Sequence, residues 1–208
     1  MLIGWCIGVV AGCSYIVVGA RPAAARESTD EFVVEVHHPG MGENPVACTV
    51  TIERDTKGDI SGYHVQVLSV FCINGVCRAV PVQLFWDPLG NYERFTVKPG
   101  MHLEKADGKP FTDADYRKLD TILADPDSPL RNLDAFVFPE HSGTTMPADA
   151  VSSPTPVVYE GAVVEGAAWT CFTLWHWVHG PLREELRKTT AAAWTPDDIA
   201  DVLEDGSE

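Results

Sequence analysis

The sequence is poor in positive charge. It contains 15 Lys and Arg residues against 30 Asp and Glu residues, which gives a formal net charge of -15. A surface of that sign repels nucleic acid and anionic lipid headgroups, and no cluster of basic residues in the sequence offsets it. The composition therefore excludes nucleic-acid binding.

The short motifs that mark common cofactor and nucleophile sites are also missing. There is no glycine-rich phosphate loop of the P-loop or Rossmann type, no CxxCH haem-attachment motif and no GxSxG nucleophile elbow. His176 and His179 lie three residues apart in a helical pattern, but no Glu stands where a helical metal motif needs one. Packing at an aromatic helix end explains this pair better than metal binding, so we predict neither catalytic residues nor a metal site.

The first 25 residues have the character of a targeting or anchoring segment. An apolar run extends from Leu2 to Ala20 and is followed by small residues at 23–25 that resemble a cleavage site. No Lys or Arg precedes the run, so a cleaved signal peptide, an uncleaved membrane anchor and a lipoprotein signal at Cys13 all stay open, as does a buried helix. Because the first three imply export, we expect an extracytoplasmic protein, periplasmic or tethered to the membrane through this segment.

Cysteine usage agrees with export. The dipeptide Asn74-Gly75 lies between Cys72 and Cys77 and is a strong signal for a type I′ hairpin turn. In such a hairpin the two cysteines face each other at a non-hydrogen-bonded position, where Cα atoms approach to about 4.5 Å. We therefore predict a Cys72–Cys77 disulfide in preference to a reduced core pair or a metal clip. Cys48 and Cys171 remain candidates for a second bridge.

Residues 31–97 have the pattern of β-strands. Five segments are rich in Val, Thr and aromatic residues, and most alternate apolar with polar positions: FVVEVHH, ACTVTIERD, GYHVQVLSVFC, CRAVPVQLFW and YERFTV. Short stretches with Gly, Pro, Asn and Asp separate them. Connections this short predict an antiparallel meander with one buried face.

Helical patterns follow the strands. Thr112 is a plausible N-cap for a helix that should end near Asp125-Pro126. Residues 157–179 have the pattern of one long helix, apolar over most of its circumference, and Gly180-Pro181 should end it. The uncharged part of this helix is too short to cross a bilayer, which favours a buried core helix. Charged helical segments are expected in residues 181–208.

The order of these elements predicts an α+β fold. We expect an antiparallel β-meander sheet packed against a long, mostly apolar C-terminal helix and a shorter helix. Residues 1–25 would form the signal peptide or anchor, residues 30–180 one α+β domain, and residues 181–208 a charged helical tail.

The segment DAVSSPT, residues 149–155, resembles the DAVSGAT signature of the FMN-binding domain family. This domain occurs in the small flavin subunits of sodium-translocating quinone reductases and in related exported redox proteins. Five of the seven residues agree, and Ser153 and Pro154 are the two that differ. In that family the final Thr carries FMN through a phosphoester. The resemblance implies that Thr155 is the acceptor, with Asp149 and Ser152 beside it.

A second partial match offers an alternative acceptor. The sequence SGTT places Thr145 after Ser142 and Gly143. For Thr155, the predicted helix from Val157 would supply free backbone N–H groups to an attached phosphate.

The resemblance covers residues 30–180 in layout and implies an exported flavoprotein that passes electrons to a redox partner protein. As an enzyme it would be at most an electron-transfer component. The alternative is a cofactor-free, disulfide-stapled extracytoplasmic interaction module or lipoprotein.

Overall fold

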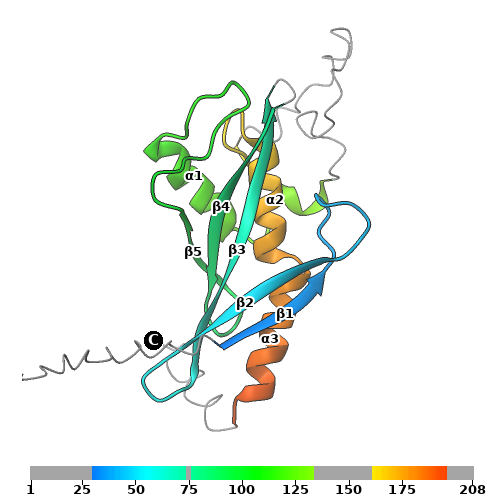
Figure 1. Cartoon of the computed structure of the whole chain (residues 1–208), viewed down its shortest axis with the longest axis vertical. Helices are drawn as coiled ribbons and strands as arrows, with labels where there is room; N and C mark the ends of the chain where they lie inside the picture. The colour runs from blue at the N-terminus through cyan, green and yellow to red at the C-terminus, as the bar shows by residue number, and fades with distance from the viewer. Residues whose placement is uncertain (1–29, 74–75, 134–160, 196–208) are drawn as a thin grey trace, which may run out of the picture.

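The computed structural model describes residues 30–73, 76–133 and 161–195, and they adopt the predicted α+β fold (Figure 1). Five strands form one sheet in the order β1-β2-β3-β4-β5, and each pair of neighbours is antiparallel. The strands are β1 (Asp30–Val36), β2 (Val46–Arg54), β3 (Ile60–Ile73), β4 (Val76–Trp86) and β5 (Tyr92–Val97). The predicted meander is therefore confirmed.

Two turns show why the strands reverse where they do. After β2, the Asp55 carboxylate accepts the backbone N–H groups of Lys57 and Asp59, and Gly58 adopts a φ of 94°. After β4, the Asp87 carboxylate accepts the N–H of Asn91, and Gly90 adopts a φ of 72°. An Asp that bonds the backbone ahead of it, followed by a Gly with positive φ, is a local turn signal.

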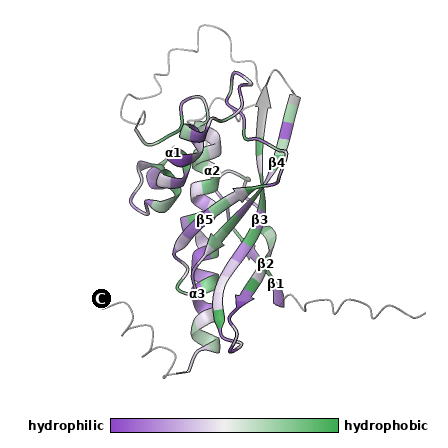
Figure 2. Cartoon of the chain, turned by 90° about the vertical axis from the view of Figure 1, so that its left-hand side faces the viewer, coloured by the Kyte–Doolittle hydropathy of each residue, from purple (hydrophilic) through white to green (hydrophobic). Residues whose placement is uncertain are grey.

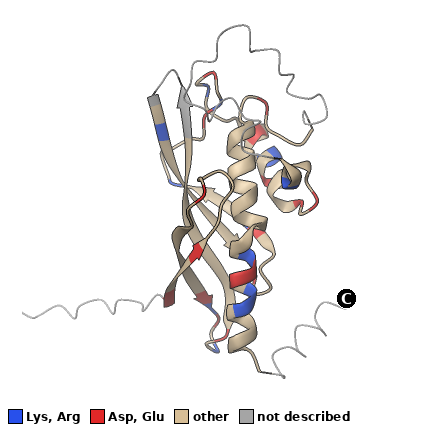
Figure 3. Ribbon diagram, turned by 90° about the vertical axis from the view of Figure 1, so that its right-hand side faces the viewer, with Lys and Arg blue, Asp and Glu red and all other residues tan. Residues whose placement is uncertain are grey.

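Among the described residues, the helices all lie on one face of the sheet (Figure 3). Helix α1 (Asp113–Ala124) begins at Thr112, as predicted, with a reciprocal capping box between Thr112 and Asp115. Its apolar stripe is buried through Leu119, Ile122 and Leu123. Alternate residues of β3, among them Tyr63, Val65 and Val67, point into the same core.

The predicted long helix is wrong over residues 161–167. Helix α2 (Ala168–His179) begins eleven residues later than the expected start at Val157, and residues 161–167 form turns. Gly166 has a φ of 72°, a left-handed conformation that interrupts a helix immediately before the N-cap Ala167. Helix α2 itself is deeply buried, because nine of its twelve residues are buried.

The predicted helix end at Gly180 is correct. Gly180 has φ -82° and ψ -161°, and α3 (Pro181–Ala193) begins at the next residue. The chain therefore bends at Gly180 and continues as a second helix. Figure 3 shows that α2 carries almost no Lys, Arg, Asp or Glu, whereas α3 carries many.

Helix α3 holds the turn between β4 and β5. Thr190 donates to the Pro88 carbonyl at 2.6 Å, Arg187 to the Leu89 carbonyl at 2.9 Å, and Arg183 to the Gly90 carbonyl at 2.8 Å. These three helix residues lie on one face, so a single helix satisfies three successive carbonyls of the turn.

Apolar residues fill the space between the sheet and the helices (Figure 2).

The β3–β4 hairpin has the register that the sequence predicts. Ile73 pairs with Val76, and Cys72 pairs with Cys77. Cys77 is disulfide-bonded, and the side chain of Cys72 lies outside the described residues. Cys48 is a buried free thiol, so it does not form the second bridge that the sequence left open. The Cys171 sulfur accepts a hydrogen bond from the Val164 N–H at 3.3 Å.

Candidate functional site

The residues of the flavin-type motif lie outside the described part of the chain. This applies to both possible acceptors and their neighbours: Thr155, Ser152, Asp149, Thr145, Gly143 and Ser142. Residues 156–160, where the helix beside Thr155 was expected to begin, lie outside the described residues as well, so the junction stays a prediction. Within the described residues, the helix begins only at Ala168.

We call residues 134–160, which contain the motif, the motif segment. The described residues on either side of it mark where it leaves and rejoins the fold. It leaves after Leu133, which follows a short 3-10 helix η1 (Pro129–Asn132). It rejoins at residues 161–167, which lie beside the loop between β5 and α1 (Figure 1). The Ala106 N–H donates to the Gly166 carbonyl at 2.6 Å and fixes this contact. Thr155 is six residues from the second of these points and 22 from the first.

A groove opens beside this return point, between β4 and the loop that follows β5. We call it the β4 groove. Its volume is about 630 Å³, and its lining includes Arg78, Val80, Met101, His102, Glu104 and Pro110. The volume falls within the range of about 300–1,000 Å³ that is typical of small-molecule sites.

The β4 groove combines apolar walls with a charged rim. Val80 is buried at its base, and Met101 is a large hydrophobic residue left 36% exposed. At the rim, the Arg78 guanidinium donates to the Glu104 carboxylate at 2.6 Å, and the Arg78 side chain stays 61% exposed. An apolar wall with a few polar groups at one edge suits a planar aromatic ligand with a polar edge, such as a flavin ring.

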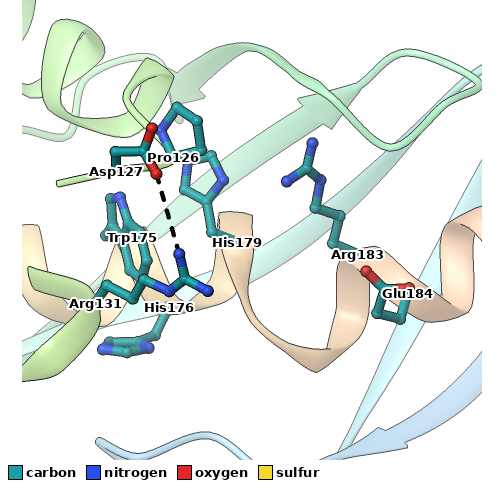
Figure 4. A pocket seen from close by; sticks show the side chains of 8 residues that line it. All are labelled: Pro126, Asp127, Arg131, Trp175, His176, His179, Arg183 and Glu184. Atoms are coloured by element: carbon teal, nitrogen blue, oxygen red, sulfur yellow. Dashed lines mark ion pairs between the residues drawn. The ribbon is translucent and has the colours of Figure 1, made fainter.

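A second, smaller pocket lies where α1, η1, α2 and α3 meet (Figure 4). We call it the α2 pocket. It measures about 380 Å³ and is lined by Pro126, Asp127, Arg131, Trp175, His176, His179, Arg183 and Glu184. Two positive and two negative side chains face it, so it offers no net charge to a ligand.

Three histidines near this pocket each donate to a main-chain carbonyl, and we call them the histidine cluster. His176 and His179 donate through Nε2 to Leu130 at 3.2 Å and to Leu123 at 2.7 Å. His38 donates through Nε2 to Thr173 at 2.9 Å. A carbonyl only accepts, so Nε2 carries the proton in each neutral ring. The predicted packing role of His176 and His179 therefore agrees with their contacts.

The surroundings of these three histidines disfavour their protonation. Nδ1 of His38 already accepts the Gly40 N–H at 3.1 Å, and Nδ1 of His179 is buried with no hydrogen-bond partner. Burial lowers the pKa of His38 and of His179. Burial, together with the nearby His38, lowers the pKa of His176 to about 4. All three rings are therefore neutral at pH 7.

The aromatic side chains of α2 belong to the core. Trp169, Trp175 and Trp177 are only 3–6% exposed. The Trp175 indole donates to the Asp125 carbonyl at 2.8 Å, and Trp169 stacks on Phe172 at 5.6 Å. These residues pack the helix against its neighbours and leave little ring surface for a ligand.

Sequence reasoning missed the β4 groove because its walls come from segments that are distant in sequence. Residues 78–80, 100–104 and 110 are close together only after β4 and the loop after β5 have been placed. The one local signal is Met101, a large apolar residue in an otherwise polar stretch that follows Gly100.

Among residues 30–73, 76–133 and 161–195, no group of three His, Cys, Asp or Glu residues is placed to hold a metal ion. In the same ranges, none of the helices has the length and apolar character needed to span a bilayer. Comparison with known proteins found no matching family model, no matching curated protein and no matching solved structure.

Proposed function

We propose that this protein is an extracytoplasmic FMN-binding protein that carries electrons to a redox partner protein. The observation that carries the proposal is the sequence DAVSSPT at residues 149–155, which shares five of seven residues with the flavin-attachment signature. FMN would supply reversible electron transfer, and the protein would hold the flavin and set its potential. The hydroxyl of Thr155, or that of Thr145, would attack the FMN phosphorus of a flavin dinucleotide on a flavin transferase, so that the phosphoester to FMN forms, the pyrophosphate bond breaks and AMP leaves.

Two structural features support this proposal. The motif segment rejoins the fold beside a groove whose size and lining suit a flavin ring. The groove rim also carries the Arg78–Glu104 ion pair, whose guanidinium has further N–H groups that could donate to the carbonyl groups of a flavin.

The test is the intact mass of the full chain, produced with its own N-terminal segment and a flavin transferase. We expect a mass increase that corresponds to one phosphoester-linked FMN, and a flavin absorbance that survives denaturation. Thr155→Ala should abolish both if Thr155 is the acceptor, and Thr145→Ala should do so if Thr145 is. Thr121→Ala is the matched control, because Thr121 lies on α1, outside the motif. A wild-type protein with the mass of the bare chain would exclude covalent flavin.

The second candidate is a cofactor-free, disulfide-stapled module for contact with a partner protein. It is favoured by the burial of the three tryptophans of α2, which leaves little indole surface for a planar cofactor. Under this alternative the secreted protein is colourless. Its intact mass then changes only on reduction, by two hydrogens, because Cys77 is disulfide-bonded.

A further inference from the structure

We propose that the face of the sheet turned away from the helices binds the same face of a second copy of this chain. We call it the outer face (Figure 3). Its exposed side chains that are charged or large and aliphatic are Glu31, Val33, Glu35, Leu68, Val70, Arg94 and Lys98. The inference goes beyond the proposed function and needs no bound flavin. It rests on apolar exposure, on opposite charge at the two edges of the face, and on the symmetry that this charge fits.

The outer face leaves aliphatic side chains in solvent. Val33 on the edge strand β1 is 66% exposed, Leu68 on β3 is 50% exposed and Val70 on β3 is 40% exposed. Leu68 pairs with Pro81 and Val70 with Ala79, so the apolar surface continues from β3 onto β4. Neighbouring apolar side chains exposed on one face indicate a surface that another protein can cover.

The two edges of the outer face carry opposite charges. The strand register places five residues in one row across the sheet, in the order Glu31, Thr51, His64, Phe85 and Arg94. The acid lies on β1 at one edge, and the base lies on β5 at the other. Four residues further along each edge, Glu35 on β1 and Lys98 after β5 repeat the pattern. The Lys98 N–H donates to the Pro81 carbonyl at 3.4 Å, which extends the β4–β5 pairing by one residue.

These four charges are available to a partner. None of them forms an ion pair with a described residue. The Arg94 guanidinium lies 3.5 Å from the centre of the Phe85 ring, and this contact holds it over the outer face. Glu53, another acid on this face, already bonds to His64 at 3.0 Å. The free charges therefore lie along the two edges.

This pattern is self-complementary for one direction of a two-fold axis. An axis that runs along β3, between two opposed outer faces, places β1 of each copy over β5 of the other. Glu31 then faces Arg94 of the second copy, and Leu68 faces Leu68 of the second copy near the axis. An axis across the strands would instead place Glu31 opposite Glu31. The charges therefore select the axis along β3. Packed sheets lie about 10 Å apart, which facing Glu and Arg side chains can bridge.

The extent of the outer face limits the strength of the contact. Five strands spaced by about 4.8 Å span about 19 Å, and the chain from Glu31 to Glu35 spans about 14 Å. A contact of this extent is at the low end of specific interfaces. The formal charge of -15 on each copy also opposes association. Salt screens this repulsion beyond about 8 Å, whereas the facing charges lie closer together. We therefore expect a weak dimer with a Kd in the micromolar range.

Sedimentation velocity of the full chain at increasing concentration tests the proposal. The wild type should form dimers reversibly at micromolar concentrations. Leu68→Glu should abolish the dimer, because it places two carboxylates next to the axis. Leu89→Glu is the matched control, because Leu89 is 43% exposed and lies in the turn after β4. It should dimerise as the wild type does.

Two charge reversals test the facing pairs. Glu31→Lys and Arg94→Glu should each weaken the dimer at least about tenfold, because symmetry places like charges opposite each other twice. An equimolar mixture of the two variants should form dimers again, since every charge then faces its opposite. Glu43→Lys, in the loop after β1, and Arg117→Glu, on α1, are the matched controls and should dimerise as the wild type does. Thermal unfolding checks that each variant is folded.

Three outcomes would overturn the proposal. The first is a wild-type chain that stays monomeric at all concentrations, whether the outer face is bare or covered by another segment of the same chain. The second is a dimer that Leu68→Glu and Leu89→Glu leave equally intact, which would place the contact elsewhere. The third is a mixture of Glu31→Lys and Arg94→Glu that forms no more dimer than either variant alone. None of these results bears on whether the chain carries flavin.

Discussion

Acidification should destabilise this protein through the histidine cluster, and His176→Gln should remove much of that effect. His176 lies at the centre of the cluster, with its ring centroid 6.2 Å from that of His38 and 5.0 Å from that of Trp175. Its Nε2–H donates to the Leu130 carbonyl, a contact that the amide of Gln can retain without taking up a proton. The substitution therefore removes the group that binds the proton and keeps the hydrogen bond to Leu130.

The direction of the effect follows from the pKa of His176. Burial and the neighbouring His38 lower this pKa from 6.5 to about 4. Between these two values the unfolded chain binds more protons than the folded one, so the free energy of unfolding falls as the pH falls. This contribution is fully present above pH 6.5 and is lost as the pH falls through about 4. His38 and His179, whose pKa values are also lowered, act in the same direction.

The size of the effect is bounded by the same shift. A lowering from 6.5 to about 4 corresponds to about 3 kcal/mol at most. The ring is partly exposed at the α2 pocket, and solvent screening reduces this to about 1–2 kcal/mol. We expect the dependence of stability on pH between 6.5 and 4 to be shallower in His176→Gln by that amount.

Urea unfolding followed by tryptophan fluorescence, repeated across this pH range, measures the effect. His37→Gln is the matched control, because His37 is exposed and lies next to His38 in the sequence. It should keep the wild-type pH dependence. The reasoning would be refuted if His176→Gln kept the same slope as wild type, or if both variants lost it equally.

Two further substitutions test the helix boundaries. Gly180→Ala should lower the free energy of unfolding by about 2–3 kcal/mol, because a Cβ at Gly180 would overlap the main-chain oxygen of His176. An unchanged urea midpoint would show that the bend between α2 and α3 relaxes freely. Thr112→Ala should cost about 1 kcal/mol by removing the N-cap of α1, whereas Thr121→Ala, inside the same helix, should be close to neutral in thermal unfolding. Equal losses in the two variants would contradict the capping role.

The parts of the fold that were predictable from sequence rest on local chemistry. The strands alternate apolar and polar residues, and their turns carry Asp and Gly at the positions where the backbone reverses. The N-cap of α1 was visible because Thr112 and Asp115 make contacts only three residues apart. Such signals need no knowledge of the rest of the molecule.

The start of α2 could not be predicted in the same way. Residues 157–167 contain no Pro and only two charged residues, so their composition alone continues the helical pattern. What stops the helix is tertiary: Gly166 takes a left-handed conformation while its carbonyl bonds to Ala106, about 60 residues away in the chain. The walls of the β4 groove are equally non-local, because they come from β4 and from the loop after β5.

The packing role of His176 and His179 also depends on partners that are distant in sequence. The last carbonyls of a helix have no partner within it, and α1 ends against α2. His179 donates to the Leu123 carbonyl, and Trp175 donates to the Asp125 carbonyl just after α1 ends. The spacing that suggests a metal motif thus places ring N–H groups along one side of α2, where they satisfy the C-terminal end of another helix. With each Nε2–H donated to a carbonyl, only Nδ1 of each ring has a lone pair for a metal ion, and among the described residues no group of three His, Cys, Asp or Glu side chains is placed to hold one.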